Sequence, residues 1–152
     1  MFERTMEMIL FIGIQATGKS SFYREHFYYT HMRINLDMLK TRTREQLLVK
    51  ACLESKTKFV VDNTNLTREE RARYITQAKQ AGFTVIGYFF QSHVADALQR
   101  NGQRTGDQRV PDKAIHGASG RLELPSRNEG YDQLYFVRLN VDNTFTAEEW
   151  KE

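Results

Sequence analysis

The run from Gly13 to Ser20 reads G-I-Q-A-T-G-K-S, which is the G-x-x-x-x-G-K-S spacing of a phosphate-binding P-loop, or Walker A motif. Glycines let the backbone turn tightly, so that its N–H groups can face an anion. At this spacing Lys19 can reach the β- and γ-phosphates of ATP, and Ser20 can hold Mg²⁺. We therefore expect ATP to be bound by these residues: Gly13, Ala16, Thr17, Gly18, Lys19, Ser20 and Ser21.

A carboxylate suited to the metal ends the apolar run 58–62, where Asp62 is the last residue. Binding sites in open α/β sheets form at the carboxyl ends of the strands, so a strand here would bring Asp62 to the loop. Asp62 could then hold Mg²⁺ together with Ser20, directly or through water. The alternative is a turn residue or helix cap, because Asn63-Thr64-Asn65 also favours a turn.

A second carboxylate, Asp37, follows the short apolar run 31–35. If that run is a strand, Asp37 opens the next helix at the same edge of the sheet. It could accept a proton from a substrate hydroxyl group as a general base. The alternative is a plain helix N-cap.

Two arginines, Arg100 and Arg104, lie four residues apart near the end of a predicted helix. That spacing places both on one helical face, and a guanidinium can hold phosphate oxygens through two hydrogen bonds. The alternative is a solvated basic helix end. Arg109 gives a weaker signal of the same kind. A basic cluster after Asp37 fits either substrate phosphates or solvated surface: Lys40, Arg42 and Arg44.

Short apolar runs alternate with helical patterns near 43–56, 67–81 and 93–103. This alternation predicts a P-loop three-layer α/β sandwich with a central parallel sheet of four or five strands. Thr67 and Glu70 suggest a capping box for the second of these helices, and Gly82 suggests its end. The expected strands are the runs 8–12, 31–35, 58–62, 83–90 and 134–139.

The 152 residues are expected to form one domain, 1–152, with its core at about 8–139. Glycines and prolines in 104–130 predict mobile loops around one short helix, and 140–152 reads as a polar tail with a short helix anchored by Trp150. The net charge of +3 permits an anionic substrate. The single Cys52 excludes an internal disulfide, and Met1–Arg4 lacks a signal-peptide pattern, so we expect a cytoplasmic protein without a membrane partner.

Taken together, these motifs resemble the kinase domain of polynucleotide 5′-hydroxyl kinases, especially the domain fused to a phosphatase in animal DNA-repair enzymes. The resemblance covers roughly residues 8 to 139, and its later stretches are the specific ones. The stretches occur in the family's order: the P-loop, Ile34–Leu39, Val60–Asn65 followed by Arg71–Tyr74, and Arg100–Arg104 followed by Val110-Pro111, Leu124-Pro125 and Glu129–Asp132.

The resemblance implies transfer of the ATP γ-phosphoryl group, with Mg²⁺, to the 5′-hydroxyl end of a nucleic acid. It implies that Asp37 is the general base and that Arg104 contacts the ATP phosphates, with Arg100 nearby. It also assigns Lys19 and Ser20 to ATP and Mg²⁺, and Asp62 to the strand end beside the metal.

The chain departs from the family at Leu36, where the family has an arginine, and at Lys40, near the place of a substrate-phosphate arginine in some members. Lysine does not replace arginine at sites with two parallel hydrogen bonds. Two alternatives therefore stay open. One is an ATP-dependent kinase of a small molecule or nucleotide, and the other is a nucleotide-binding ATPase or switch without kinase activity.

Overall fold

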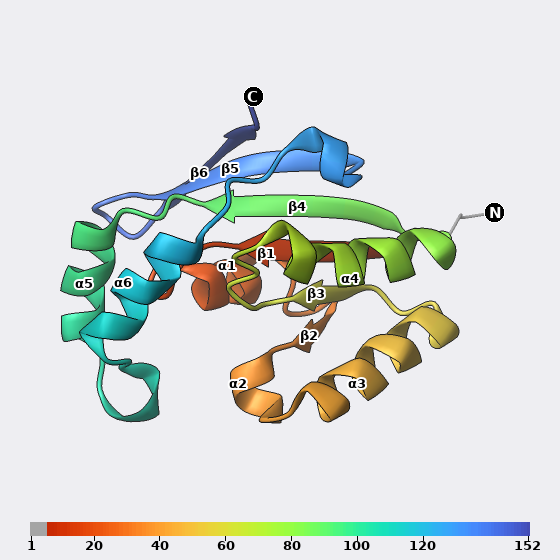
Figure 1. The fold of residues 1–152 in the computed structure, drawn as a ribbon, viewed down its shortest axis with the longest axis horizontal. Helices are drawn as coiled ribbons and strands as arrows, with labels where there is room; N and C mark the ends of the chain where they lie inside the picture. Colours follow the sequence, from red (N-terminus) through yellow and green to blue (C-terminus); the bar gives the residue numbers. More distant parts are fainter. Residues whose placement is uncertain (1–5) are drawn as a thin grey trace.

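The computed structural model describes residues 6–152, so Met1–Arg4, on which the expected absence of a signal peptide rests, lies outside the described residues. Strands and helices alternate along most of the chain (Figure 1). Two 3₁₀ turns, η1 (Gly106–Gln108) and η2 (Arg127–Glu129), flank the last helix. The elements are β1 (Glu7–Ile12), α1 (Lys19–His26), β2 (Met32–Ile34), α2 (Leu36–Leu39), α3 (Arg42–Ser55), β3 (Phe59–Val61), α4 (Arg68–Gln80), β4 (Thr84–Phe90), α5 (Val94–Gly102), α6 (Asp112–Arg121), β5 (Gln133–Leu139) and β6 (Phe145–Glu149).

The strands form one sheet in the order β2-β3-β1-β4-β5-β6. β1 lies inside the sheet and pairs in parallel with both β3 and β4, which explains why its residues from Met8 to Ile12 are all apolar. β2 and β5 extend the parallel part, and β6 pairs antiparallel with β5. The predicted α/β sandwich is confirmed, with a sixth strand added to the five expected.

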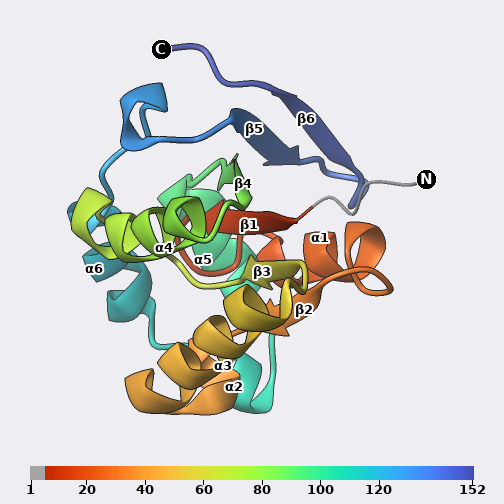
Figure 2. The same cartoon turned by 90° about the vertical axis from the view of Figure 1, so that its right-hand side faces the viewer.

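Helices cover both faces of the sheet (Figure 2). Met8, Leu10 and Ile12 of β1 pack with α3 and α4 on one face. Ile9 and Phe11, which point the other way, pack with α1 on the opposite face. Successive side chains of a strand alternate between faces, so β1 contributes to both halves of the core.

The predicted helix in the tail 140–152 is wrong, because Phe145–Glu149 is the edge strand β6. Glu148 and Glu149 are successive residues on opposite faces of this edge strand, and both are exposed to solvent, so polar residues are tolerated on either face. Phe145 packs against Phe22 of α1, with ring centroids 5.2 Å apart. Trp150 does anchor the end, with its ring 5.4 Å from Phe89.

The segment expected as loops around one short helix contains a ten-residue helix, α6, between the turns η1 and η2. α5 and α6 lie together beyond the carboxyl ends of the parallel strands (Figure 1). They pack on the P-loop through Ala97, Ile115 and Ala118, which meet Ile14 and Ala16. This contact ties the P-loop to the segment that carries Arg104.

The α4 boundaries agree with the expected signals in part. The Thr67 hydroxyl accepts a hydrogen bond from the Glu70 N–H at 3.2 Å, and Gly82 follows the helix at φ 80°. The Glu70 carboxylate instead accepts from Arg121 at 2.9 Å, so the capping box is only half formed. Within residues 6–152, no helix combines the length and apolar composition that a membrane span requires.

Candidate active site

The P-loop joins the buried strand β1 to the first residue of α1, as the motif predicts. Gly18 is the N-cap of α1 and adopts the left-handed conformation, at φ 97°. A Cβ at this position would lie 2.8 Å from the Phe145 ring, so β6 leaves no space for a side chain here. Ser92 fixes the other side of the loop, because its hydroxyl accepts a hydrogen bond from the Ile14 N–H at 3.1 Å.

Lys19 folds back along the P-loop. Its Nζ donates to the carbonyl oxygens of Gly13 at 2.9 Å and Ile14 at 2.6 Å. Burial lowers the pKa of Lys19 to about 8; Arg104 also lowers it, while Asp62 and Asp37 raise it. These four charges therefore act on one another across the site.

Asp62 lies at the end of β3 and is almost fully buried, with 2% of its side chain exposed. Its Oδ2 accepts from the Ser20 hydroxyl at 3.2 Å and from Arg33 Nε at 2.9 Å. Arg33 also donates from its terminal nitrogen to Ser20 Oγ at 3.0 Å. The alternative of a turn residue or helix cap does not describe this carboxylate, whose side chain turns back to the P-loop.

The Ser20 and Asp62 oxygens fit Mg²⁺ as ligands, because Mg²⁺ is bound in proteins by carboxylates and other oxygen donors together with substrate phosphates. The guanidinium of Arg33 bridges the same two oxygens, so this point in the structure attracts a cation. Arg33 was missed by the sequence analysis. The one feature of the sequence that could have indicated a role for Arg33 is its place as a basic residue in the short run that precedes Asp37.

Asp37 is an exposed residue of α2. The alternative of an N-cap is wrong, because Asn35 caps the helix and its Oδ1 accepts from the Met38 N–H at 2.9 Å. Two further hydrogen bonds attach α2 to the end of β3: Asn35 Nδ2 donates to the Asp62 carbonyl at 2.6 Å, and the Leu36 N–H donates to Asn63 Oδ1 at 2.8 Å. These bonds hold α2 so that Asp37 lines the same cavity as Ser20 and Asp62. The Asp37 carboxylate takes part in none of these bonds.

A buried carboxylate, that of Glu45 in α3, holds Asn63 and so supports the position of α2. It accepts from Asn63 Nδ2 at 2.8 Å, from the Tyr74 hydroxyl at 2.5 Å and from Arg42 at 3.0 Å. Burial, with the Glu45 hydrogen bond, raises the pKa of Tyr74 above its ordinary value. Arg42 is therefore engaged within the fold, and Arg44 donates to the Leu39 carbonyl at 3.2 Å.

The two predicted phosphate-binding arginines have different surroundings. Arg104 lines the cavity at the P-loop and donates to the Gln108 carbonyl at 3.3 Å, and burial lowers its pKa. Arg100 donates to the carbonyls of Ala16 at 3.3 Å and Leu139 at 3.4 Å, so it braces the P-loop against the end of β5. Arg109, like the cluster Lys40, Arg42 and Arg44, is not among the residues that line this cavity.

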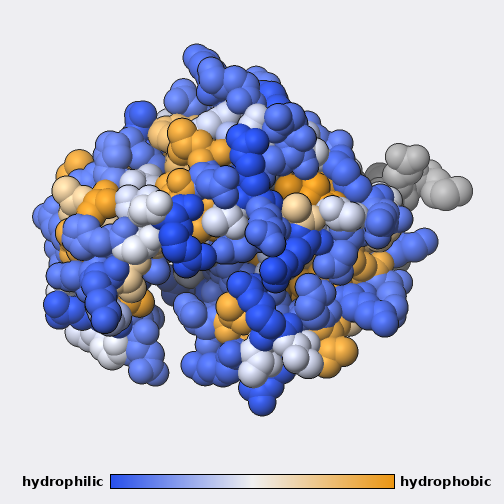
Figure 3. Space-filling model, viewed as in Figure 1, coloured by the Kyte–Doolittle hydropathy of each residue, from blue (hydrophilic) through white to orange (hydrophobic). Residues whose placement is uncertain are grey.

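The cavity has a volume of about 600 Å³. The space-filling view shows the molecule hollowed between its α5–α6 side and its α2–α3 side (Figure 3). One group of lining residues, here called the nucleotide end, surrounds the P-loop: Gln15, Ala16, Gly18, Lys19, Ser20 and Arg104. A second group, here called the tyrosine end, comes from α1, β2 and the loop between them: Tyr23, Arg24, Tyr28 and Arg33. Asp37 and Asp62 line the same cavity.

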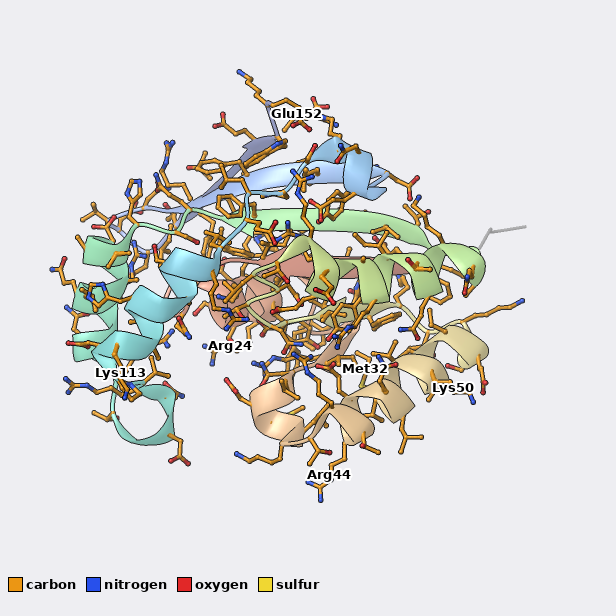
Figure 4. The ribbon with its side chains drawn as sticks, viewed as in Figure 1. Arg24, Met32, Arg44, Lys50, Lys113 and Glu152 are labelled. Carbon is orange, nitrogen blue, oxygen red and sulfur yellow. The ribbon has the colours of Figure 1, made fainter. Side chains whose placement is uncertain are left out.

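Sequence reasoning missed the tyrosine end entirely. In Figure 4, Arg24 extends from α1 toward the space that lies between α6 and α2 in this view. The sequence does show arginine and tyrosine residues in 23–28. A helix as short as α1 has too few turns for a periodic pattern to distinguish the side that faces the cavity from the side that faces solvent.

The stretches that follow the P-loop serve largely to hold it in place. Asn65 Nδ2 donates to the Phe11 carbonyl at 2.7 Å and so fixes the end of β1. The fully buried Arg71 binds the carboxylate of Glu129 at 2.8 Å and also donates to the Asn65 carbonyl at 2.9 Å. Two of the stretches that carry the resemblance, Arg71–Tyr74 and Glu129–Asp132, are thus joined by one buried ion pair.

The chain is similar to known proteins in sequence and in fold. Residues 33–125 match the family model described as an AAA domain. The bifunctional polynucleotide phosphatase/kinase of Schizosaccharomyces pombe is 27% identical over 135 residues, which are 84% of this chain and 32% of that protein. The chain therefore spans about a third of the length of this curated relative.

Among solved structures, Kti12 of Chaetomium thermophilum in complex with ADP-AlF3 is similar with a TM-score of 0.70 at 16% identity, over 90% of this chain and 92% of that chain. A gluconokinase from Sinorhizobium meliloti 1021 is similar with a TM-score of 0.61 at 19% identity, over 89% of this chain and 83% of that one. At these identities the likeness establishes the fold, which is that of P-loop kinases and related NTPases.

Proposed function

We propose that this chain, which belongs to the AAA domain family, transfers the γ-phosphoryl group of ATP to a hydroxyl group, namely the 5′-hydroxyl of a polynucleotide. The observation that carries the proposal is the composition of the cavity. A P-loop lysine, a Ser20–Asp62 oxygen pair, an available carboxylate and an arginine line one space. Phosphoryl transfer requires these parts: a phosphate cradle, metal ligands, a base and a cation for the transferring group.

At the nucleotide end, the amine of Lys19 would exchange its two carbonyl partners for β- and γ-phosphate oxygens of ATP. Gly18 and the following N–H groups of α1 would face the same phosphates. Bound Mg²⁺, held by Ser20 and Asp62, would neutralise charge on the phosphates. Arg104 would approach the γ-phosphoryl group, where a guanidinium stabilises the charge that develops during transfer.

Asp37 would act as the base. Among the described residues its carboxylate has no hydrogen-bond or ion-pair partner, so it is available to receive a proton. α2 is held at the cavity through Asn35, which follows β2, and through Asn63, which follows Asp62 at the end of β3. A substrate hydroxyl between Asp37 and the γ-phosphate would lose its proton to Asp37 as its oxygen forms the new P–O bond. The bond from the γ-phosphorus to the β–γ bridging oxygen would break, and ADP would leave.

The polynucleotide acceptor is supported by the Schizosaccharomyces pombe relative, whose name includes a polynucleotide kinase activity. A phosphatase activity is not part of the proposal, because this chain corresponds to a third of that protein. The single free cysteine, Cys52, is buried, which suits a cytoplasmic enzyme.

A kinase of a small hydroxyl compound is the second candidate, favoured by the likeness to a gluconokinase fold and by Leu36 at the position of the family's arginine. A cavity of about 600 Å³ would hold a nucleotide together with a compact acceptor. A nucleotide-binding ATPase or switch is the third, and it would have no use for Asp37 at the cavity.

The test is a screen of acceptors with γ-labelled ATP and Mg²⁺, using 5′-hydroxyl oligonucleotides of DNA and RNA, nucleosides, and sugars such as gluconate. The Lys19→Ala variant is the matched control for contaminating kinases. Label on oligonucleotides supports the proposal. Label on gluconate or nucleosides alone favours the second candidate, and release of inorganic phosphate without acceptor labelling favours the third.

A further inference from the structure

The loop between α1 and β2 exposes two adjacent aromatic side chains. Tyr28 is 60% exposed and Tyr29 is 93% exposed, although both are large. Their rings lie 5.0 Å apart at 88°, edge to face. Figure 2 shows this loop projecting from the side of the molecule that carries α1. The two rings therefore form a small aromatic surface that the fold itself leaves uncovered.

This surface is continuous with the cavity. Tyr28 lines the cavity, and Tyr29 extends the surface outward from it. α1 lies between the P-loop and these tyrosines, and its eight residues rise by about 12 Å. The aromatic surface is thus about one helix length from the phosphates, beyond the reach of an acceptor that consists of a single nucleotide.

Positive charge lies between the tyrosines and the Ser20–Asp62 pair. Arg24 and Arg33 both line the cavity, and the Arg33 guanidinium is 5.9 Å from the centre of the Tyr23 ring. The nearby carboxylate of Glu25 faces His26 at 3.9 Å and does not line the cavity. A row of arginines that leads to exposed aromatic rings is suited to bind a single-stranded nucleic acid, whose phosphates contact the arginines and whose unpaired bases stack on the rings.

We propose that Tyr28 and Tyr29 form a stacking platform for bases of a single-stranded acceptor, downstream of the nucleotide that is phosphorylated. Arg24 binds the phosphates that connect these bases, and Arg33 contributes the N–H groups that its bonds to Asp62 and Ser20 leave free. This inference rests on the proposed polynucleotide kinase function and specifies its substrate class. At a rise of about 3.4 Å per stacked nucleotide, three to four nucleotides span the length of α1. Bases held in a duplex are stacked and paired already and gain nothing from the platform.

The experiment measures binding and turnover on the same preparations. Fluorescence anisotropy reports binding of single-stranded 5′-hydroxyl oligomers of eight nucleotides, of the matching blunt duplex, and of a nucleoside 3′-monophosphate as competitor. The variants are Tyr28→Ala, Tyr29→Ala and Tyr29→Phe. The control is Leu47→Ala, since Leu47 is 64% exposed on α3 and does not line the cavity.

We expect each alanine variant to weaken binding of the single strand by about 5- to 150-fold, the range for loss of one base-stacking ring. Tyr29→Phe keeps the ring and is expected to bind as the unmodified protein does. In Tyr29→Ala, whose side chain does not line the cavity, binding of the monophosphate and its phosphorylation should change less than twofold. Thermal melting checks that the variants are folded. We expect Tyr29→Ala to fold normally, because the Tyr29 side chain is exposed and is not part of the core.

Equal binding of the single strand by Tyr29→Ala and Leu47→Ala would overturn the platform. Equal losses for the single strand and the monophosphate would overturn it too, because the tyrosines would then act at the reacting nucleotide. A dimer that separates in the alanine variants, seen by size-exclusion chromatography, would assign the surface to a second copy of the chain. Tyrosine-dependent binding without phosphorylation would leave the platform standing and refute the proposed kinase function.

Discussion

The two ends of the cavity are built from different material. The nucleotide end consists of backbone in left-handed or tightly turned conformations and of partly buried charges. Gly18 has no room for a side chain, and the Lys19 amine is held against the loop carbonyls of Gly13 and Ile14. The tyrosine end consists of exposed side chains on a short helix and a loop, with Tyr29 almost fully in solvent. Substitution at the first end should therefore stop the chemistry, whereas substitution at the second should change which acceptor is used.

The largest effect is expected at Lys19. Lys19→Ala removes the cation between the β- and γ-phosphates, and we expect transfer to fall by about 10³-fold or more and ATP binding to weaken. Calorimetry with ATP and a single-turnover assay measure the two effects. Near-normal turnover in this variant would refute the P-loop assignment.

Asp37→Asn should lower turnover by about 10²–10⁴-fold, the range for loss of a general base. ATP affinity and melting temperature should stay nearly unchanged, because Asn35 and not Asp37 caps α2. Both are measured on the preparation used for the rates. Should the variant melt early while each folded molecule keeps its normal rate, Asp37 has a structural role instead.

Arg104→Ala should slow transfer by about 10²-fold with little change in acceptor affinity, since a guanidinium at the γ-phosphate stabilises the transition state more than the ground state. Arg104→Lys should recover part of the rate, because lysine keeps the charge without the planar fork. If the alanine variant instead binds acceptor more weakly and with less dependence on salt, at preserved turnover, Arg104 belongs to the acceptor side.

The smallest effect concerns pH. Because burial lowers the pKa of Lys19 to about 8, its amine loses charge above that pH and attracts phosphates less. ATP affinity should fall by about tenfold between pH 8 and pH 9–10, measured by calorimetry, with Lys19→Arg as the matched variant that stays charged. In the unfolded chain the lysine keeps its ordinary pKa and binds more protons, so this group makes the folded state gain stability as pH rises from 8 toward 10.5. An ATP affinity that does not change over this pH range would contradict the lowered pKa of Lys19.

The sequence predicts the nucleotide end well because its signals are local. The spacing of Gly18, Lys19 and Ser20 follows from one turn of backbone, and β1 is apolar because both of its faces are covered. α6 was expected only as a short helix because it contains Gly117 and Gly120, which disfavour helices. Packing of Ile115 and Ala118 against the P-loop outweighs that preference.

Features that depend on contacts distant in sequence could not be predicted. Arg33 meets Asp62 across 29 residues, and nothing near Arg33 in the sequence indicates the partner. β6 carries a polar sequence, and only its pairing with β5 makes it a strand. The exposure of Tyr28 and Tyr29 is equally a property of the fold, because an aromatic pair after a helix more often belongs to a core.

The central claim is that the cavity transfers phosphate to a 5′-hydroxyl, and locating the label tests it most directly. The protein is incubated with γ-labelled ATP, Mg²⁺ and a single-stranded 5′-hydroxyl oligomer, and the product is digested to mononucleotides that keep their 5′-phosphates. We expect label on the nucleotide from the 5′ end, and none when the oligomer already carries a 5′-phosphate. Label found only as inorganic phosphate, at the same rate with and without oligomer, would contradict it.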